Sequence, residues 1–376
     1  MKTDSFPLFP RTFALLSRSA LAHNVRWLRE RLPARTRLLA VVKANAYGHG
    51  VGVVGPELER LGVDALGVAA TAEAAELRHA GVSAPLYLLS PVLAEEASRI
   101  VEADAVCLLQ DVEFARALSA EAVSRGVELS VHLKVDVGMS RFGVPPGRAE
   151  EVAAVVDAMS GLHLAGIVTH FPCADSNPEL TRQQWQLFAK VAERVMKRLG
   201  RPLIRHAAAS AGLLSVPESA SDMVRCGVLV YGVAPSGNNP AALGLKPVLS
   251  LHTRVVALRR VPTGTRVGYG GTFTARRETL VATLPVGYGD GYLRALGNRA
   301  QVLLRCRRVP VIGRVCMDQM MIDATDTGAE VGDLVTLIGR QGDEEITVNE
   351  IARWLDTTPH EVTTLLSVRV HRMLVD

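Results

Sequence analysis

The sequence predicts an α/β fold, a (β/α)8 TIM-like barrel followed by a mostly β C-terminal domain. From about residue 36 to residue 232, short β-rich runs alternate with helical patterns, which is typical of repeated βα units and a parallel sheet. Eight such runs can be counted, the number of strands in a closed barrel of this kind. After about residue 240 the pattern changes to β-branched runs separated by glycine and proline. A length of 376 residues accommodates both domains.

The eight predicted strands follow one another with helical segments such as Thr71–Ala80 and Pro178–Leu199 between them. They are Leu38–Lys43, Ala65–Ala69, Pro85–Ser90, Ala105–Leu109, Leu129–Asp136, Leu162–His170, Leu203–Ala208 and Met223–Tyr231. An open, doubly wound sheet is the alternative. That fold gathers its site near one crevice, whereas the polar candidate residues of this chain follow strands that are spread around a ring. We therefore favour the barrel.

The second domain is expected to be mostly antiparallel. Its strand candidates are Val248–Val261, Arg266–Ala275, Leu280–Val286, Gln301–Leu304 and Val309–Ile322. One helix is expected at Val348–Leu355, because Thr347 is a suitable N-cap and Glu350 follows three residues later, as in a capping box. The segment Asn238-Asn239-Pro240 marks the expected linker, so the predicted domains are residues 1–240 and 241–376.

Composition indicates an ordinary globular protein, with 48% hydrophobic and 21% charged residues. The net charge of +4 is small and the arginines are scattered, so no nucleic-acid binding is expected. Five cysteines without a CxxC pair indicate reduced thiols and no metal site. Met1 to Pro10 lacks the pattern of a signal peptide, and no run of about 18 apolar residues occurs. We expect a cytoplasmic protein that binds no membrane.

Lys43 is the most informative residue, because the apolar run before it ends abruptly at an amine. A lysine at a strand end usually extends its amine into solvent. A partly desolvated amine instead has the lowered pKa that Schiff-base chemistry needs. The phenol of Tyr47 and the close-approaching backbone of Gly48 and Gly50 suit a phosphate-bearing ligand beside that amine. These neighbours favour a functional lysine.

Polar residues follow several other predicted strands at their carboxyl ends, where barrel enzymes build their sites. They are Lys134 and Asp136 on the fifth strand, His170 on the sixth, His206 and Ser210 at or just beyond the seventh, and Arg225 in the eighth. The loops after the last two strands commonly form a phosphate site. We expect the phosphate ligands to be Tyr47, Ser210 and the backbone amides of Gly227 and Val228.

The segment from Ala40 to Gly50 resembles the pyridoxal-phosphate attachment motif of alanine racemases, and the resemblance extends from about residue 11 to the C-terminus. It implies that Lys43 binds pyridoxal 5'-phosphate and exchanges a proton with Cα of the substrate. It further implies that Lys134 is carboxylated to a carbamate that orients Arg141, which bonds the cofactor phenolic oxygen. Without the resemblance, a surface cluster of Lys134, Asp136 and Arg141 at a strand end is the better interpretation.

The resemblance places Arg225 against the pyridine nitrogen of the cofactor, next to His170, with His206 among the cofactor-binding residues. An arginine there disfavours protonation of the ring and limits delocalisation of the carbanion. Limited delocalisation favours reprotonation at Cα, and hence racemisation over transamination.

In the second domain, glycine-flanked tyrosines and the segment Gly313 to Met320 also resemble the family. Racemisation is most directly done with two bases on opposite faces of Cα. By resemblance Tyr269 is the second base, Tyr288 lines the entrance, and Met317 and Asp318 address the substrate carboxylate. In this family the tyrosine comes from the partner subunit. The resemblance therefore implies a head-to-tail homodimer with composite sites, which makes D-alanine for cell-wall peptidoglycan.

The sequence departs from the family pattern at four positions. Val137 and Ser140 stand where threonine and glycine are usual, Ala209 replaces an asparagine, and His360 replaces a C-terminal tyrosine that reaches the phosphate. Several alternatives remain at this point. They are a racemase of serine or of broad specificity, a barrel-type decarboxylase, a non-catalytic pyridoxal-phosphate carrier, and a cofactor-independent racemase with Cys316 as nucleophile.

Overall fold

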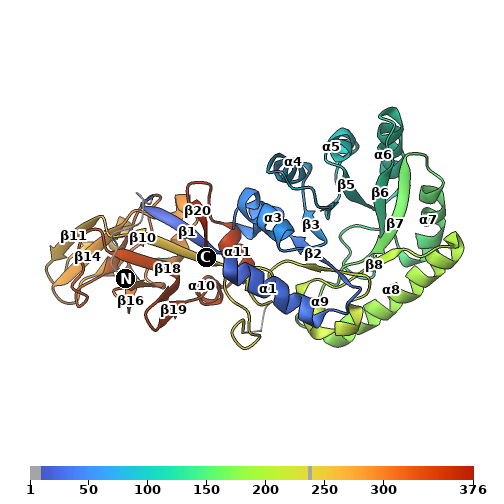
Figure 1. Ribbon diagram of the computed structural model, residues 1–376. Helices are drawn as coiled ribbons and strands as arrows, with labels where there is room; N and C mark the ends of the chain where they lie inside the picture. Colours follow the sequence, from blue (N-terminus) through green and yellow to red (C-terminus); the bar gives the residue numbers. More distant parts are fainter. Residues whose placement is uncertain (1–9, 236–238) are drawn as a thin grey trace. The chain divides into compact units, whose positions relative to one another are not determined.

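The computed structural model of the protein describes residues 10–235 and 239–376, which form two compact units (Figure 1). The first, the barrel unit, contains residues 22–46 and 50–230. The second, the β-rich unit, contains the segment before residue 22, residues 47–49 and the chain from residue 231 onward. Asn238 of the expected linker and residues 1–9 of the N-terminal segment lie outside the described residues.

Eight parallel strands build the barrel unit, in the order β8-β7-β6-β5-β4-β3-β2-β9. Their bounds are β2 (Arg37–Val41), β3 (Ala65–Val68), β4 (Leu86–Leu88), β5 (Ala105–Leu109), β6 (Leu129–Lys134), β7 (Leu162–Val168), β8 (Ile204–His206) and β9 (Met223–Cys226). The ring closes between β8 and β9, where Ala209 pairs with Arg225 and the Arg225 backbone N–H donates to the Ala208 carbonyl at 3.0 Å. The predicted barrel is confirmed.

Helices lie on the outside of these strands (Figure 1). They are α1 (Arg18–Arg31), which begins in the β-rich unit, α3 (Val51–Arg60), α4 (Thr71–His79), α5 (Ala97–Glu102), α6 (Val112–Ser124), α7 (Ala149–Asp157), α8 (Pro178–Leu199) and α9 (Ser210–Ser215). Helix α8 has the predicted bounds because its signals are local. The Asn177 side chain accepts from the Leu180 N–H, Pro178 occupies the first turn, and Gly200 ends the helix in a left-handed conformation.

The β-rich unit contains a ten-stranded sheet in the order β11-β14-β17-β16-β15-β18-β10-β1-β20, with β19 paired to β18. The bounds are β1 (Thr12–Ser17), β10 (Leu249–Arg254), β11 (Ala257–Val261), β14 (Thr279–Leu284), β15 (Gln301–Leu304), β16 (Arg307–Ile312), β17 (Met320–Asp323), β18 (Leu334–Gln341), β19 (Glu344–Ile346) and β20 (His371–Val375). Most pairs are antiparallel, as expected. Helix α10 (Val348–Leu355) also follows the prediction, and Thr347 Oγ1 accepts from the Glu350 N–H at 3.1 Å. Helix α11 (Pro359–Thr364) is an addition.

Strand β1 belongs to the β-rich unit. The expected domain boundary assigned all residues before 241 to the barrel. The strand pairs antiparallel with β10 and parallel with β20. The Thr12 and Thr253 hydroxyls lie 2.9 Å apart across this pairing, and Phe13, Ala14 and Leu16 are buried. The partners of β1 are more than 200 residues away in sequence, so no local pattern identifies its sheet.

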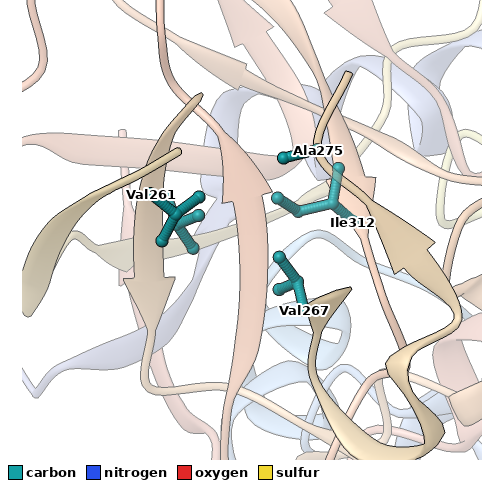
Figure 2. Close-up of a cluster of buried hydrophobic side chains, with 5 residues drawn as sticks. Val261, Val267, Ala275 and Ile312 are labelled. Carbon is teal, nitrogen blue, oxygen red and sulfur yellow. The ribbon is translucent and has the colours of Figure 1, made fainter. Parts of the chain in front are cut away.

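A short hairpin of β12 (Arg266–Val267) and β13 (Phe273–Thr274) carries the turn that contains Tyr269. A cluster of buried side chains anchors this hairpin (Figure 2), namely Val261, Val267, Ala275, Val281 and Ile312. Phe273 and Met321 pack against this cluster. Burying each of the larger of these side chains contributes about 1.5–3 kcal/mol. The turn that contains Tyr269 is therefore held in place by a packed hydrophobic cluster. No helix in the described part of the chain is both long and apolar enough to cross a membrane.

Candidate active site

Lys43 follows β2 and opens a left-handed turn, α2 (Lys43–Tyr47). Ala44, Asn45 and Ala46 have φ of 52°, 55° and 54°. For residues with a side chain, this conformation costs about 1–2 kcal/mol each. Such strain persists only where the surroundings impose it, and it is concentrated at functional sites.

Glu73 of α4 holds this turn from outside. Its Oε1 accepts from the Ala44 N–H at 2.6 Å, and its Oε2 accepts from the Ala69 N–H at 2.8 Å. The Asn45 side chain accepts from the Val51 N–H at 2.7 Å, which links the turn to α3. The sequence prediction, which ended a strand at Lys43, missed both the left-handed turn and Glu73. Asn45, a residue that tolerates positive φ, was the available signal.

The half-buried amine of Lys43 lies among other charges. Burial lowers its pKa, and the charges of Arg141 and Arg225 lower it further, while Glu73 opposes them. A lowered pKa increases the fraction of neutral amine, which is the nucleophilic form. Such an environment suits the Schiff-base role that the sequence predicts for Lys43.

Lys134 ends β6 and is only 2% exposed. Its Nζ donates to the Val135 carbonyl at 2.9 Å and lies 5.3 Å from the centre of the Phe142 ring. Burial lowers the pKa of Lys134 to about 8, against the opposing charge of Asp136. Arg141 lies 5.5 Å from the same ring centre. The structure thus brings Lys134 and Arg141 to one aromatic side chain.

The loop between Lys134 and Arg141 contains Val137 and Ser140, two of the four positions at which the sequence departs from the family pattern. Val137 is buried, and the carboxylate of Asp136 accepts from the backbone N–H groups of Gly138 and Met139 at 3.0 and 2.8 Å. Ser140 has a φ of 55°, a left-handed conformation that glycine adopts without strain. The serine therefore keeps the backbone shape expected of a glycine at this position.

Arg225 lies inside the barrel and is only 6% exposed. Its guanidinium donates to the carbonyls of Thr169 at 2.7 Å and Ala207 at 3.0 Å. It also lies 3.2 Å from His206 Nδ1 and 3.4 Å from His170 Nδ1. These acceptors are the partners of the Arg225 guanidinium among the described residues. None of them is a carboxylate.

Burial lowers the pKa of Arg225 to about 10, which leaves the side chain charged at neutral pH. Burial, and next the charge of Arg225, lower the pKa of His170 to about 3. His206 is also driven well below its usual pKa, first by burial. The site therefore contains a cation held by neutral groups.

Ser210 and Gly227 meet at the ring closure. The Gly227 N–H donates to Ser210 Oγ at 3.1 Å, and Val228 follows in the next position of the chain. Ala209, where asparagine is usual in the family, pairs with Arg225 through its backbone. That contact requires no particular side chain, so the replacement leaves the closure of the barrel intact.

Tyr47 belongs to the β-rich unit, where its ring lies 5.3 Å from Tyr231 and 6.3 Å from the ring of His360. His360 thus lies beside the phenol proposed as a phosphate ligand, at the position where the family usually has tyrosine. Gly48 packs against helix α11, because an added Cβ would lie 1.8 Å from the Thr363 carbonyl oxygen. Glycine is therefore required at this point of the motif.

Tyr269 is 72% exposed and lies between Gly268 and Gly270, both of which have φ of 73°. A Cβ at Gly270 would lie 3.1 Å from an Arg314 guanidinium nitrogen. The glycine therefore leaves room for Arg314 beside the turn. The phenol itself extends into solvent from the turn.

Tyr288 and Met317 lie on two interlocked loops of the β-rich unit. The Tyr288 N–H donates to the Cys316 carbonyl at 3.0 Å, and the Gly289 N–H donates to the Met317 carbonyl at 2.9 Å. Arg369 contacts Asp318 at 2.7 Å and Asp290 at 3.2 Å, so the Asp318 carboxylate already has a cationic partner. No pattern in the sequence singles out Arg369, which lies 51 residues after Asp318.

The rival nucleophile Cys316 is unsuited to act as a thiolate. Burial raises its pKa, and its Sγ lies 3.6 Å from the Arg314 carbonyl oxygen. A catalytic cysteine needs the opposite shift.

Comparison with known proteins identifies the family. A family model described as "Alanine racemase, N-terminal domain" matches residues 16–235, and one described as "Alanine racemase, C-terminal domain" matches residues 248–374. The chain belongs to the alanine racemase family. The resemblance seen in the segment around Lys43 is thereby confirmed.

Individual relatives agree with this result. The chain is 40% identical over 364 residues to an alanine racemase of Halothermothrix orenii, and 42% identical over 364 residues to one of Symbiobacterium thermophilum, with 96% of each chain covered in both cases. The structure of alanine racemase from Bacillus anthracis with bound L-Ala-P has a TM-score of 0.91 at 32% identity, covering 99% of this chain and 96% of that one. The structure from Streptomyces lavendulae has a TM-score of 0.92 at 32% identity, covering 99% and 98%. The protein is therefore an enzyme of the isomerase class.

Proposed function

We propose that the protein interconverts L-alanine and D-alanine with pyridoxal 5'-phosphate as its cofactor. The observation that carries the proposal is the half-buried Lys43 on a strained turn at a strand end, with its pKa lowered by burial and by two arginines. Together with family membership, this favours a lysine that reacts as a free amine with the aldehyde of the cofactor.

The residues of the barrel unit fit such a cofactor. Arg225 is a buried cation whose partners are neutral, and Arg141 adds positive charge, so an anionic ligand suits the site. Lys43 would hold the cofactor covalently and Arg225 its ring, with His206 supporting Arg225. Within this unit, Ser210 and the backbone of Gly227 and Val228 would hold the phosphate. When bound, the cofactor withdraws electrons from Cα of the amino acid attached to it and so weakens the Cα–H bond.

Arg225 controls where the negative charge resides once the Cα proton has left. Its positive charge would disfavour protonation of the ring nitrogen of the cofactor and so limit how much negative charge the ring withdraws from Cα. Charge retained at Cα favours return of a proton to Cα. This supports racemisation over decarboxylation or transamination.

Two side chains would exchange the Cα proton from opposite faces. Lys43 Nζ, released when the amino group of the substrate replaces it on the cofactor, would hold the proton for one face, and the Tyr269 hydroxyl would hold it for the other. Tyr269 would come from the partner in a head-to-tail homodimer, and its 72% exposure leaves the phenol available to another chain. His170, whose Nδ1 faces Arg225, would keep its proton on Nε2 to interact with that phenol.

Arg141, Met317, Asp318 and Tyr288 are the proposed substrate-binding residues. A carbamate on Lys134 would convert a repelling cation into an anion that orients Arg141. The pKa of about 8 for Lys134 supports this, since about a tenth of the amine is neutral at pH 7 and able to capture carbon dioxide. Adding 13C-bicarbonate should give a carbamate NMR signal that is absent from Lys134→Arg. Equal spectra for the two proteins would reject the modification.

The main test supplies L-alanine, and separately other L-amino acids, to the protein with pyridoxal phosphate, and resolves the products by chiral chromatography. D-Alanine should form fastest, and Lys43→Ala should abolish it. Faster formation of D-serine would make the protein a serine-directed or broad racemase, and carbon dioxide release would indicate a decarboxylase. Bound cofactor without any product would indicate a carrier. We place the activity in the cytoplasm, where its D-alanine would supply peptidoglycan synthesis.

A further inference from the structure

A third histidine extends the contact between Arg225 and His206 deeper into the barrel. His132 lies on β6, two residues before Lys134, and is fully buried. Its Nδ1 lies 2.7 Å from His206 Nε2, and the two rings meet nearly edge to face at a centroid distance of 4.8 Å. Arg225, His206 and His132 therefore form one hydrogen-bonded chain inside the barrel.

The chemistry of the three groups fixes every proton in this chain. A guanidinium can only donate, so His206 Nδ1, 3.2 Å from Arg225 Nη1, must accept. The proton of neutral His206 then lies on Nε2 and is donated to His132 Nδ1. His132 must in turn carry its own proton on Nε2. The reverse arrangement would place an Nδ1–H of His206 against a guanidinium N–H.

Both histidines are kept neutral, as this arrangement requires. Burial, followed by the charges of Arg37 and Arg225, lowers the pKa of His132 to about 3. Burial and the charges of His132 and Arg225 also keep the pKa of His206 well below its usual value. Near pH 7 each ring therefore has one proton and one free lone pair.

The barrel provides a specific space for the His132 ring. The register between β6 and β7 shifts at Val131 and His132, which brings His132 opposite Gly166. A Cβ on Gly166 would lie 2.4 Å from His132 Cε1 and Nδ1. Tyr87 packs nearly perpendicular to both histidines, at 5.2 Å from His132 and 6.1 Å from His206. A bulge and a glycine thus accommodate this one imidazole.

His132 is also a costly residue for this position. Its Nε2 is buried and has no hydrogen-bond partner among the described residues. An unsatisfied buried polar group costs about 1–3 kcal/mol, and an apolar side chain would avoid that cost. A purely structural role does not explain an imidazole here, whereas a role for its other nitrogen does.

We propose that His132 is a positioning residue for the reaction. It accepts the Nε2–H of His206 and so holds His206 in the tautomer whose Nδ1 accepts from Arg225. The guanidinium is thereby kept in place for the cofactor ring. This inference rests on the proposed function for its catalytic consequence, but the proton arrangement itself belongs to the protein without cofactor.

The first experiment measures that arrangement directly. Imidazole 15N–1H NMR spectra of the cofactor-free protein, assigned with His132→Asn and His206→Asn, should show both rings neutral with the proton on Nε2. A proton on Nδ1 of His206 would overturn the proposal, whatever the enzyme catalyses. This measurement also decides the matter if an apolar variant fails to fold.

The second experiment compares variants of the cofactor-loaded enzyme. His132→Leu removes the acceptor, so kcat should fall about 10- to 100-fold, as for a displaced electrostatic group, with KM for alanine changed less than about 3-fold. Pyruvate from transamination should rise relative to D-alanine. His132→Asn retains an acceptor oxygen near the Nδ1 position and should restore kcat to within about 3-fold of wild type.

His252→Leu is the matched control, since it removes a buried histidine from the β-rich unit and should leave the kcat and the product ratio unchanged. Equal losses in His132→Leu and His132→Asn, or no loss in either, would refute the positioning role. If no variant, including wild type, makes D-alanine, the proposed function fails while the NMR result still tests the tautomers.

Discussion

At the scale of single residues, Ser140 shows how one side chain is retained under strain. Its φ of 55° places a residue with a Cβ where the backbone of the Lys134–Arg141 loop turns left-handed. The neighbouring Asp136 carboxylate fixes the turn by accepting from Gly138 and Met139. The loop shape is thus imposed by its surroundings and does not come from the preference of the serine.

Ser140→Gly should therefore stabilise the protein by up to about 1 kcal/mol, because glycine adopts this φ without steric cost. Ser140→Ala is the control, since it removes the hydroxyl and keeps the Cβ. Urea unfolding of both variants checks the prediction. Stabilisation by alanine as large as that by glycine would show that the hydroxyl, and not the backbone, is responsible.

At the scale of elements, helix α4 is coupled to the left-handed turn through Glu73. One carboxylate accepts from Ala44 on the turn and from Ala69 at the end of β3. The same charge raises the pKa of Lys43 against the effect of burial. Shape and charge at the reactive lysine are therefore set by a residue of the neighbouring βα unit.

Glu73→Gln should lower the pKa of Lys43 further, since the opposing negative charge is lost. The rate at which the cofactor-free protein reacts with pyridoxal phosphate should then reach its plateau at lower pH than in wild type. Glu73→Ala should also speed amide exchange at Ala44, while amides of α8 keep their protection. An unchanged pH profile in Glu73→Gln would contradict the electrostatic part of this prediction.

The same elements show how far a sequence alone can predict them. The bounds of helix α8 were predicted to the residue, and in the structure local signals, Asn177 and Gly200, mark its ends. The positions of Lys134 at the end of a strand, and of Lys43 and His170 just after strands, followed from hydrophobic runs. The pairing of β1 could not be predicted, since β10 and β20 lie far along the chain. Glu73 and His132 lacked any local signal as well, because each acts through a neighbour that only the fold brings near.

At the scale of the whole molecule, the proposed site takes Tyr269 from a second chain. Lys43→Ala and Tyr269→Phe should each be nearly inactive alone. If sites are composite, mixing the two under conditions that exchange subunits should restore about a quarter of wild-type activity, because half of the dimers then contain one intact site. Activity that stays at the level of the separate variants would refute a shared site.

Acid should destabilise the protein through its buried histidines. In the β-rich unit, burial lowers the pKa of His252 from 6.5 to about 4. Between these values the unfolded chain binds more protons, so the free energy of unfolding falls as pH drops through this window, by up to about 1.4 kcal/mol per pH unit.

His252→Gln should remove that part of the slope between pH 6.5 and pH 4. Trp354 reports on this unit when Trp27 and Trp185 of the barrel unit are replaced by phenylalanine. Urea unfolding followed by fluorescence at several pH values gives the slopes. Parallel pH dependences with and without His252 would exclude the histidine as a cause.

At the closure of the barrel, the backbone and the side chain of Arg225 have different roles. The backbone of Arg225 bonds to Ala208 and pairs with Ala209, whereas its side chain alone contacts the histidines. The side chain at position 225 can therefore be exchanged while the backbone hydrogen bonds that close the barrel are kept. Combined with replacements at His206 and His132, that position is a practical place to redirect this scaffold toward a different amino-acid reaction.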